Sequence, residues 1–217
     1  MVEAAFGDEL ITVAGDGDTT VGDLLGDYVP TADGRYEFID GPLVNAMAEG
    51  RCLFIDDATL ISPKVLAVVY PAMDGRRQVT VKAHGGKAVQ AKPGFYVVAG
   101  HNPGVHGAVL TDALASRFSA QIHVSTDYDL ARRIGVDPRI VRAARDLAAR
   151  AETGEITWAP QLRELLAARR IETALGAEAA AANLLGVAPV EDRDVVAQIL
   201  TTHLGRTIPA LSLGRQL

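Results

Sequence analysis

Two acidic side chains follow directly on an apolar segment in the first half of the sequence. Residues 52–55 read CLFI and run into Asp56 and Asp57. A second apolar segment, FYVVA at residues 95–99, leads to Asn102. If both segments are neighbouring parallel strands, these polar residues meet at the carboxyl edge of the sheet, where open α/β folds bind ligands.

Each of these residues also has an ordinary structural explanation. Adjacent acids most often mark the end of a strand at the surface, and Asn102 before Pro103 is a common turn signal. His101 and His106 could ligate a metal, but no third ligand at a suitable spacing is evident, so loop roles are favoured. The functional interpretation therefore depends on the order of several features along the chain.

One arginine extends the set. Residues 110–118, LTDALASRF, predict a helix that delivers Arg117 shortly before a further short strand at 121–124. Taken alone, such an arginine would most often lie on the surface.

The elements that must position these residues alternate between strands and helices. Apolar strands separated by helices imply a parallel sheet covered on both faces. We expect strands at 10–14, 52–55, 95–99 and 121–124, hairpins over 28–40 and 78–91, and helices over 1–6, 41–50 and 62–73. Within the loop before the first hairpin, Asp23 is expected to cap a short helix.

The pattern changes after Ser125, because only helical periodicity follows. Asp137 and Pro138 predict the capped start of a long helix, and three more helices are expected after it. The predicted fold class is thus α/β, with an α/β part over residues 1–126 and an all-helical part over residues 127–217.

Composition narrows the class of protein. The 217 residues carry a formal net charge of −6, which argues against broad nucleic-acid binding. No apolar run is long enough for a membrane span and no secretory signal opens the sequence. The single cysteine, Cys52, is expected to be a buried thiol. These features predict a cytoplasmic protein with no membrane partner.

Taken together, the motifs resemble those of AAA+ ATPases, closest to the MoxR and dynein-related branch. LFIDD resembles the Walker B motif, VVAGHNP resembles sensor one, and LASRF resembles the arginine-finger segment. GDTTVGDLLGDY followed by GRYEFIDGPLVNAMAEG resembles the loop and hairpin insert of this branch. The resemblance runs from residue 1 to about residue 124, and the helical remainder resembles the lid of the family.

This resemblance implies roles for individual residues. Asp56 would hold Mg²⁺, Asp57 would polarise the attacking water and Asn102 would help place it, with ATP as the cofactor. The family usually has Glu where this chain has Asp57, so turnover is expected to be slow. Arg117 would reach the γ-phosphate of a neighbouring subunit. Arg163 is the nearest candidate for the sensor-two arginine that contacts the nucleotide, although it is out of step with the usual spacing.

The resemblance also implies partners. Arginine fingers act between subunits, so we expect a homo-oligomer, a hexameric ring that remodels or matures a partner protein in a chaperone-like way. Partners in this branch often carry metal-dependent adhesion-type domains, but nothing in the sequence selects one.

One expected motif is missing. The phosphate-binding loop G-x-x-x-x-G-K-[ST] occurs nowhere in the 217 residues, so the expected P-loop NTPase-like sheet lacks its first strand as well. We expect an N-terminally truncated chain whose upstream part carries the strand and loop. The alternative is a nucleotide-independent interaction module or a non-hydrolysing ring subunit. GTP in place of ATP also stays open, because no base-reading residue is visible.

Overall fold

The computed structural model describes residues 7, 10–102, 108 and 110–210. The chain divides into two compact units, Met1–Gln121 and Ile122–Leu217, and each is described by itself. The N-terminal helix expected over residues 1–6 lies outside the described residues. Within the described part, no helix combines the length and apolar character needed to cross a membrane.

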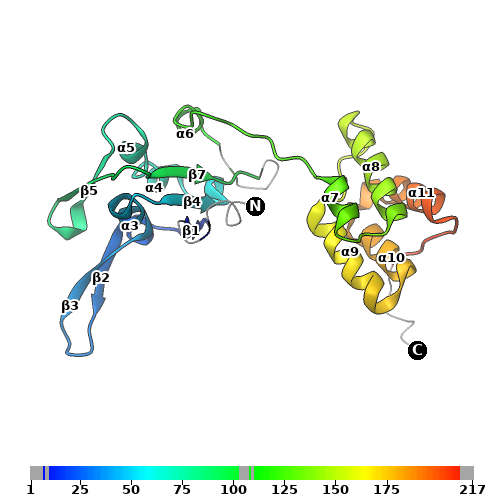
Figure 1. Cartoon of the computed structure of the whole chain (residues 1–217), viewed down its shortest axis with the longest axis horizontal. Helices are drawn as coiled ribbons and strands as arrows, with labels where there is room; N and C mark the ends of the chain where they lie inside the picture. The colour runs from blue at the N-terminus through cyan, green and yellow to red at the C-terminus, as the bar shows by residue number, and fades with distance from the viewer. Residues whose placement is uncertain (1–6, 8–9, 103–107, 109, 211–217) are drawn as a thin grey trace. The chain divides into compact units, whose positions relative to one another are not determined.

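The first unit contains a parallel sheet of three strands in the order β1-β4-β7 (Figure 1). Its strands are β1 (Leu10–Ala14), β4 (Cys52–Asp56) and β7 (Tyr96–Ala99). The register pairs Leu10 with Cys52 and Cys52 with Tyr96, so the strands run in step to a common carboxyl edge. The parallel α/β arrangement predicted from the apolar strands is therefore confirmed.

The strand expected at residues 121–124 is wrong. This segment is irregular, and the side chains of Ile122 and Val124 are 83% and 64% exposed. Backbone groups of a strand need partners, and the described sheet ends at β7 without a further strand beside it. Unpaired backbone in this segment is exposed to water instead. The strand propensity of residues 121–124 is therefore not sufficient to form a strand.

Short helices cover the sheet of the first unit. They are α2 (Val21–Leu25), α3 (Pro42–Glu49), α4 (Pro63–Leu66), α5 (Tyr70–Met73) and α6 (Asp112–Ala115), with 3₁₀ turns η2 (Ala58–Leu60) and η3 (Lys82–His84). The single helix expected over 62–73 is split, because Pro71 has no N–H to continue a helix and sits in the first turn of α5. The helix expected over 110–118 is likewise shorter.

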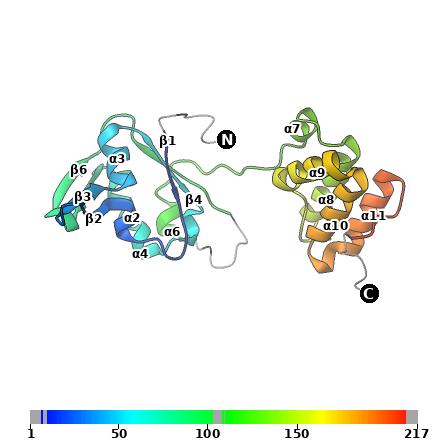
Figure 2. The ribbon, with the colours of Figure 1, turned by 90° about the horizontal axis from the view of Figure 1, so that it is seen from below.

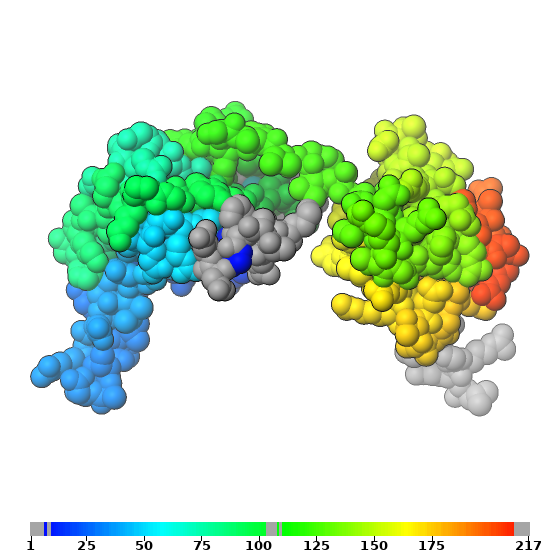
Figure 3. Space-filling view, viewed as in Figure 1, coloured from blue at the N-terminus to red at the C-terminus, as the bar shows by residue number. Residues whose placement is uncertain are grey.

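Two antiparallel hairpins extend from this unit. They consist of β2 (Gly26–Pro30) with β3 (Tyr36–Asp40), and of β5 (Gln78–Val81) with β6 (Lys87–Gln90). The first projects away from the parallel sheet, as the space-filling view also shows (Figure 3). Its base is held by the preceding helix α2, where Thr20 and Asp23 form a reciprocal capping box.

The core of the first unit lies between the sheet, its helices and the bases of the hairpins. Leu43 of α3 and Leu53 of β4 are completely buried, and Ile55 is nearly so. The free thiol of Cys52 is also buried, as predicted. Desolvation raises the pKa of this thiol. Strand β4 is thus fixed on both faces, which makes its carboxyl end a rigid platform.

The second unit is entirely helical in its described residues (Figure 2). Its elements are α7 (Tyr128–Arg133), α8 (Pro138–Glu152), α9 (Leu162–Leu175), α10 (Ala177–Val187), η4 (Val190–Asp192) and α11 (Arg193–Leu204). The predicted start of the long helix is present, since Asp137 caps α8 through the backbone N–H of Arg139. Ile140 and Leu147 of α8 face the core of this unit.

Candidate functional site

The carboxyl end of β4 carries both predicted acids. Asp56 is the last residue of the strand, and its carbonyl accepts a hydrogen bond of 2.8 Å from the N–H of Gly15, just past β1. Asp57 follows in the left-handed region, with φ 49°, and its N–H donates to the Asp56 Oδ1 at 3.1 Å. Both carboxylates are exposed. The chain thus turns sharply at the strand end and leaves both acids open to solvent.

The end of β7 lies directly beside this turn. The N–H of Gly100 donates to the carbonyl of Ile55 at 2.8 Å, and the Gly100 carbonyl accepts from the N–H of Ala58 at 3.0 Å. A Cβ atom on residue 100 would come within 2.8 Å of the Asp56 Oδ1. The structure therefore brings Asp56 and Asp57 next to Gly100, with Asn102 exposed two residues further on.

His101 is tied back to the β4 side of the edge. Its Nδ1 and the Oγ1 of Thr59 share a hydrogen bond of 2.9 Å, and Thr59 is only 3% exposed. This bond connects the segment after β7 to the turn after β4. His101 therefore has a structural role, and His106 lies outside the described residues. Sequence reasoning missed Thr59, because a threonine in a turn carries no signal of its own.

Arg117 lies just past α6 and contacts its own chain. Its guanidinium carbon sits 4.1 Å from the centre of the Tyr70 ring, a cation–π contact, and its Nη1 donates to the Ala113 carbonyl. Its Nε is buried and finds no hydrogen-bond partner among the described residues. Tyr70, like Thr59, was missed, because a tyrosine in a predicted helix is most simply interpreted as core.

An ionised carboxylate, Asp74, lies near Arg117. Asp74 has its pKa lowered to about 2, first through the hydrogen bond from the Arg76 side chain and to a lesser extent through the charge of Arg117. Asp74 stays ionised at neutral pH and forms a salt bridge with Arg76. Arg117 itself makes no ion pair within the described residues, although its charge interacts with Asp74.

Arg163 belongs to the second unit. It lies in the first turn of α9, its side chain is 83% exposed, and its guanidinium pairs with Glu164 at 3.2 Å. An exposed pair of this kind contributes little to stability. Arg163 is thus an exposed surface cation of the second unit.

The donor set indicates what kind of cation the edge could hold. No cluster of three or more His, Cys, Asp or Glu side chains occurs among the described residues. The described residues of this edge therefore do not form a closed protein cage for a metal. Mg²⁺ commonly uses one or two carboxylates and completes its shell with water and substrate phosphates. Asp56 and Asp57, exposed at one strand end, fit that mode of binding.

A family comparison gives this arrangement a context. The protein-family description "AAA domain (dynein-related subfamily)" matches residues 1–118, which is more than half of the 217-residue chain and includes β1, β4, β7 and the segment up to Arg117.

Relatives match the same half of the chain. An uncharacterised protein of Staphylococcus aureus (strain USA300) is 38% identical over 107 residues, which are 48% of this chain and 40% of that protein. A protein of the bovine strain RF122/ET3-1 matches to the same extent. The matched region thus spans well under half of the length of these relatives. Among solved structures, a candidate ATPase from Cytophaga hutchinsonii aligns over 92% of this chain and 70% of its own, with 19% identity and a TM-score of 0.46.

Proposed function

Since the chain belongs to the dynein-related subfamily of AAA domains, we propose that it acts in ATP binding and hydrolysis as a subunit of a ring. The observation that carries the proposal is the junction of Asp56 and Asp57 with the Gly100–Asn102 segment at one edge of a parallel sheet. Families of this class bind nucleotide, usually with a divalent metal. The edge offers carboxylate and amide groups of the types that such chemistry needs.

The proposed roles follow from position. Asp56, fixed by the β1–β4–β7 junction, is the proposed ligand of Mg²⁺, which would neutralise phosphate charge. Asp57 is the proposed group that orients the attacking water, and Asn102 would hold that water from the β7 side. The carboxylate of Asp57 is one methylene shorter than the Glu usual in the family. We therefore expect slow turnover.

Arg117 is the proposed arginine finger for a neighbouring subunit. It is a cation without a carboxylate partner among the described residues, so its charge is available to a phosphate. A hexameric ring is the proposed assembly, and Arg163 is the proposed nucleotide contact from the helical unit, which would act as a lid. Energy from hydrolysis would serve the MoxR-like remodelling of a partner protein, such as one with a metal-dependent adhesion-type domain, in the cytoplasm.

The phosphate-binding loop is the part that this sequence does not supply. The edge of β7 away from β4 has no strand beside it in the described sheet. A further strand that carries such a loop is proposed to pair with β7 at this edge. The absence of the motif from the sequence favours a second candidate function, a non-hydrolysing ring subunit that offers Arg117 to a competent neighbour.

The mass and activity of the protein purified from its own source distinguish the two candidate functions. We would place an affinity tag at the C-terminal end of the chromosomal gene, purify the protein from its own source, and measure intact mass and Mg²⁺-dependent hydrolysis of ATP and GTP. Hydrolysis that an Asp56→Asn variant loses, with its assembly intact, would support the first candidate. The Glu37→Gln variant, which changes an exposed acid on the projecting β2–β3 hairpin, is the matched control.

Other outcomes would redirect the proposal. A natural product of 22.9 kDa that neither binds nor hydrolyses nucleotide would exclude intrinsic catalysis. If such a product nevertheless accelerates a nucleotide-competent ring partner, and Arg117→Ala removes the acceleration, the second candidate holds. Equal hydrolysis by wild type and Asp56→Asn would refute the metal role of Asp56.

A further inference from the structure

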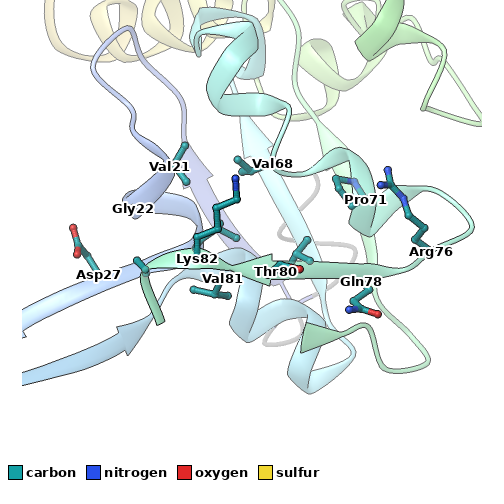
Figure 4. Close-up of a pocket in the computed structure, with 14 residues that line it drawn as sticks. Val21, Gly22, Asp27, Val68, Pro71, Arg76, Gln78, Thr80, Val81 and Lys82 are labelled. Carbon is teal, nitrogen blue, oxygen red and sulfur yellow. The ribbon is translucent and has the colours of Figure 1, made fainter. Parts of the chain in front are cut away.

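A groove on the first unit is separate from the carboxyl edge. It has a volume of about 780 Å³ and lies between α2, the α4–α5 region and strand β5 (Figure 4). Its walls are mainly apolar, with Val21 and Leu25 on one side and Val68 and Pro71 on the other. The volume lies within the range of ordinary ligand pockets. None of the proposed nucleotide residues lines it.

One side of this groove is the free edge of a strand. The N–H of Ala91 donates to the carbonyl of Arg77, which places the hydrogen-bonded pairs of the β5–β6 ladder on odd-numbered residues of β5. The N–H and C=O groups of Gln78 and Thr80 therefore point away from β6. Neither residue has another strand beside it in the described part of the chain. These groups are positioned to pair with an added strand.

This edge lacks the features that usually protect exposed strands. Natural edge strands carry lysines, prolines or bulges that discourage pairing. Strand β5 reads QVTV, without a charge or a proline, and its register with β6 is regular. In contrast, β2 of the other hairpin contains Asp27 and Pro30. The open edge of β5 is thus suited to pairing.

The edge is also held in a fixed position. Arg77 enters β5 with φ 48°, a strained conformation for an arginine, and its guanidinium donates to the carbonyl of Phe95 at 3.2 Å. Val79 and Val81 are buried in the core of the unit. A peptide that adds to β5 would therefore meet a preorganised template.

The charges around the groove identify the partner. Lys82 follows β5, and its side chain extends toward Val21 and Val68 (Figure 4). It forms no ion pair within the described residues, whereas Arg76 at the other end is neutralised by Asp74 at 2.5 Å. Asp27 lies at the α2 side and its Oδ1 accepts from the N–H of Tyr28. Lys82 is thus the cation that extends into the groove and forms no ion pair in the described part of the chain.

We propose that this groove binds an extended peptide segment of a partner protein, which adds as a strand to the free edge of β5. The segment would place apolar side chains at alternate positions against the groove walls and a carboxylate beside Lys82. Main-chain hydrogen bonds to Gln78 and Thr80 would provide affinity, and the pockets between the walls would provide specificity. The proposal is independent of nucleotide hydrolysis.

The test uses the 217-residue chain and a labelled heptapeptide, acetyl-Thr-Glu-Thr-Val-Thr-Val-Thr-amide, with binding followed by fluorescence anisotropy. The same peptide in reverse order covers parallel addition. Thr80→Pro removes an N–H that faces the groove but leaves the β6 ladder intact. The matched control is Thr80→Val, which keeps the backbone donor.

We expect saturable binding to the wild type, unchanged within about twofold by Thr80→Val and weakened about fivefold or more by Thr80→Pro. Lys82→Glu should reverse the preference, so that a peptide with Lys in place of its Glu binds more tightly. If Thr80→Pro unfolds, peptides N-methylated at alternate amides replace it, and only one of the two methylation registers should abolish binding. Absence of saturable binding below about 1 mM peptide, or equal affinities of the proline and valine variants, would overturn the proposal.

Discussion

Replacement of Arg117 by alanine distinguishes an arginine that the fold needs from one that is kept for another subunit. The side chain makes one cation–π contact with Tyr70 and one hydrogen bond to the Ala113 carbonyl, while its buried Nε has no partner among the described residues. The two contacts stabilise the first unit, whereas the buried Nε without a partner destabilises it. Their sum decides how much stability the first unit should lose.

The expected loss is small. The cation–π contact is worth about 0.5–2 kcal/mol, and an exposed hydrogen bond of this kind adds about 1 kcal/mol. A buried donor without a partner costs about 1–3 kcal/mol. At the midpoints of these ranges, the net contribution of Arg117 to the free energy of unfolding is within about 1 kcal/mol of zero. An arginine with so little structural value fits a role outside its own subunit.

Hydrogen exchange followed by mass spectrometry measures this quantity in the first unit alone, through peptides that contain β4 and β7. We expect Arg117→Ala to lower their protection by no more than about fivefold, which corresponds to about 1 kcal/mol. Leu114→Ala is the matched control on the same short helix, because Leu114 is 4% exposed. Its loss should be about 2–4 kcal/mol.

A large effect would refute the reasoning. If Arg117→Ala lowered protection as much as Leu114→Ala, the arginine would be a structural element of α6, and its proposed role as a finger would lose its physical support. A small effect on protection combined with loss of nucleotide turnover in the natural assembly is the combination that the proposal requires.

Two further predictions concern single capping and turn positions. Asp137→Ala should lower the free energy of unfolding of the second unit by about 2 kcal/mol. Asp137→Asn should lower it by about half of that, because Asn still caps α8. Urea unfolding followed by Trp158 fluorescence measures both losses. Hydrogen bonding from Arg139 lowers the pKa of Asp137 in the folded state. The stabilisation by Asp137 is therefore present above the unfolded pKa of about 3.9 and is lost as the pH falls through the lower pKa of the folded state. Parallel pH profiles of unfolding for the wild type and the Asp137→Asn variant would contradict this. Gly26→Ala should cost more than about 2 kcal/mol, because its Cβ would meet the Ile39 carbonyl oxygen at 2.2 Å, whereas Gly34→Ala in the same hairpin should cost about 1 kcal/mol; equal losses in hydrogen exchange would contradict this reasoning.

The parallel sheet and the site edge were predictable because their signals are local. Apolar runs such as 52–55 specify buried strands, and the topology of a parallel sheet then requires their ends to meet. The start of α8 was equally clear, because Asp137 and Pro138 are strong start signals. None of these inferences needed knowledge of a distant contact.

The failures have a different cause. Residues 121–124 have strand propensity, but a strand forms only where a neighbour supplies backbone partners, and propensity contains no information on that. The contact of Arg117 with Tyr70 joins two segments far apart in the sequence. The bond between Thr59 and His101 is of the same kind. Such contacts arise from the packing of the whole unit and cannot be predicted from spacing.

Two residues in left-handed backbone show how strain can be interpreted in this fold. Arg77 and Asp57 have φ of 48° and 49°, and such conformations persist only where the surroundings enforce them. For Arg77 the fold itself explains the side chain, which donates to the Phe95 carbonyl. The carboxylate of Asp57 is exposed and accepts no hydrogen bond within the described residues, so it contributes nothing evident to the turn it occupies. A glycine would adopt this turn at lower cost. Asp is one of the few residues besides glycine that adopt this region readily, so the turn accommodates it, and the exposed carboxylate is what the proposed water-orienting role requires.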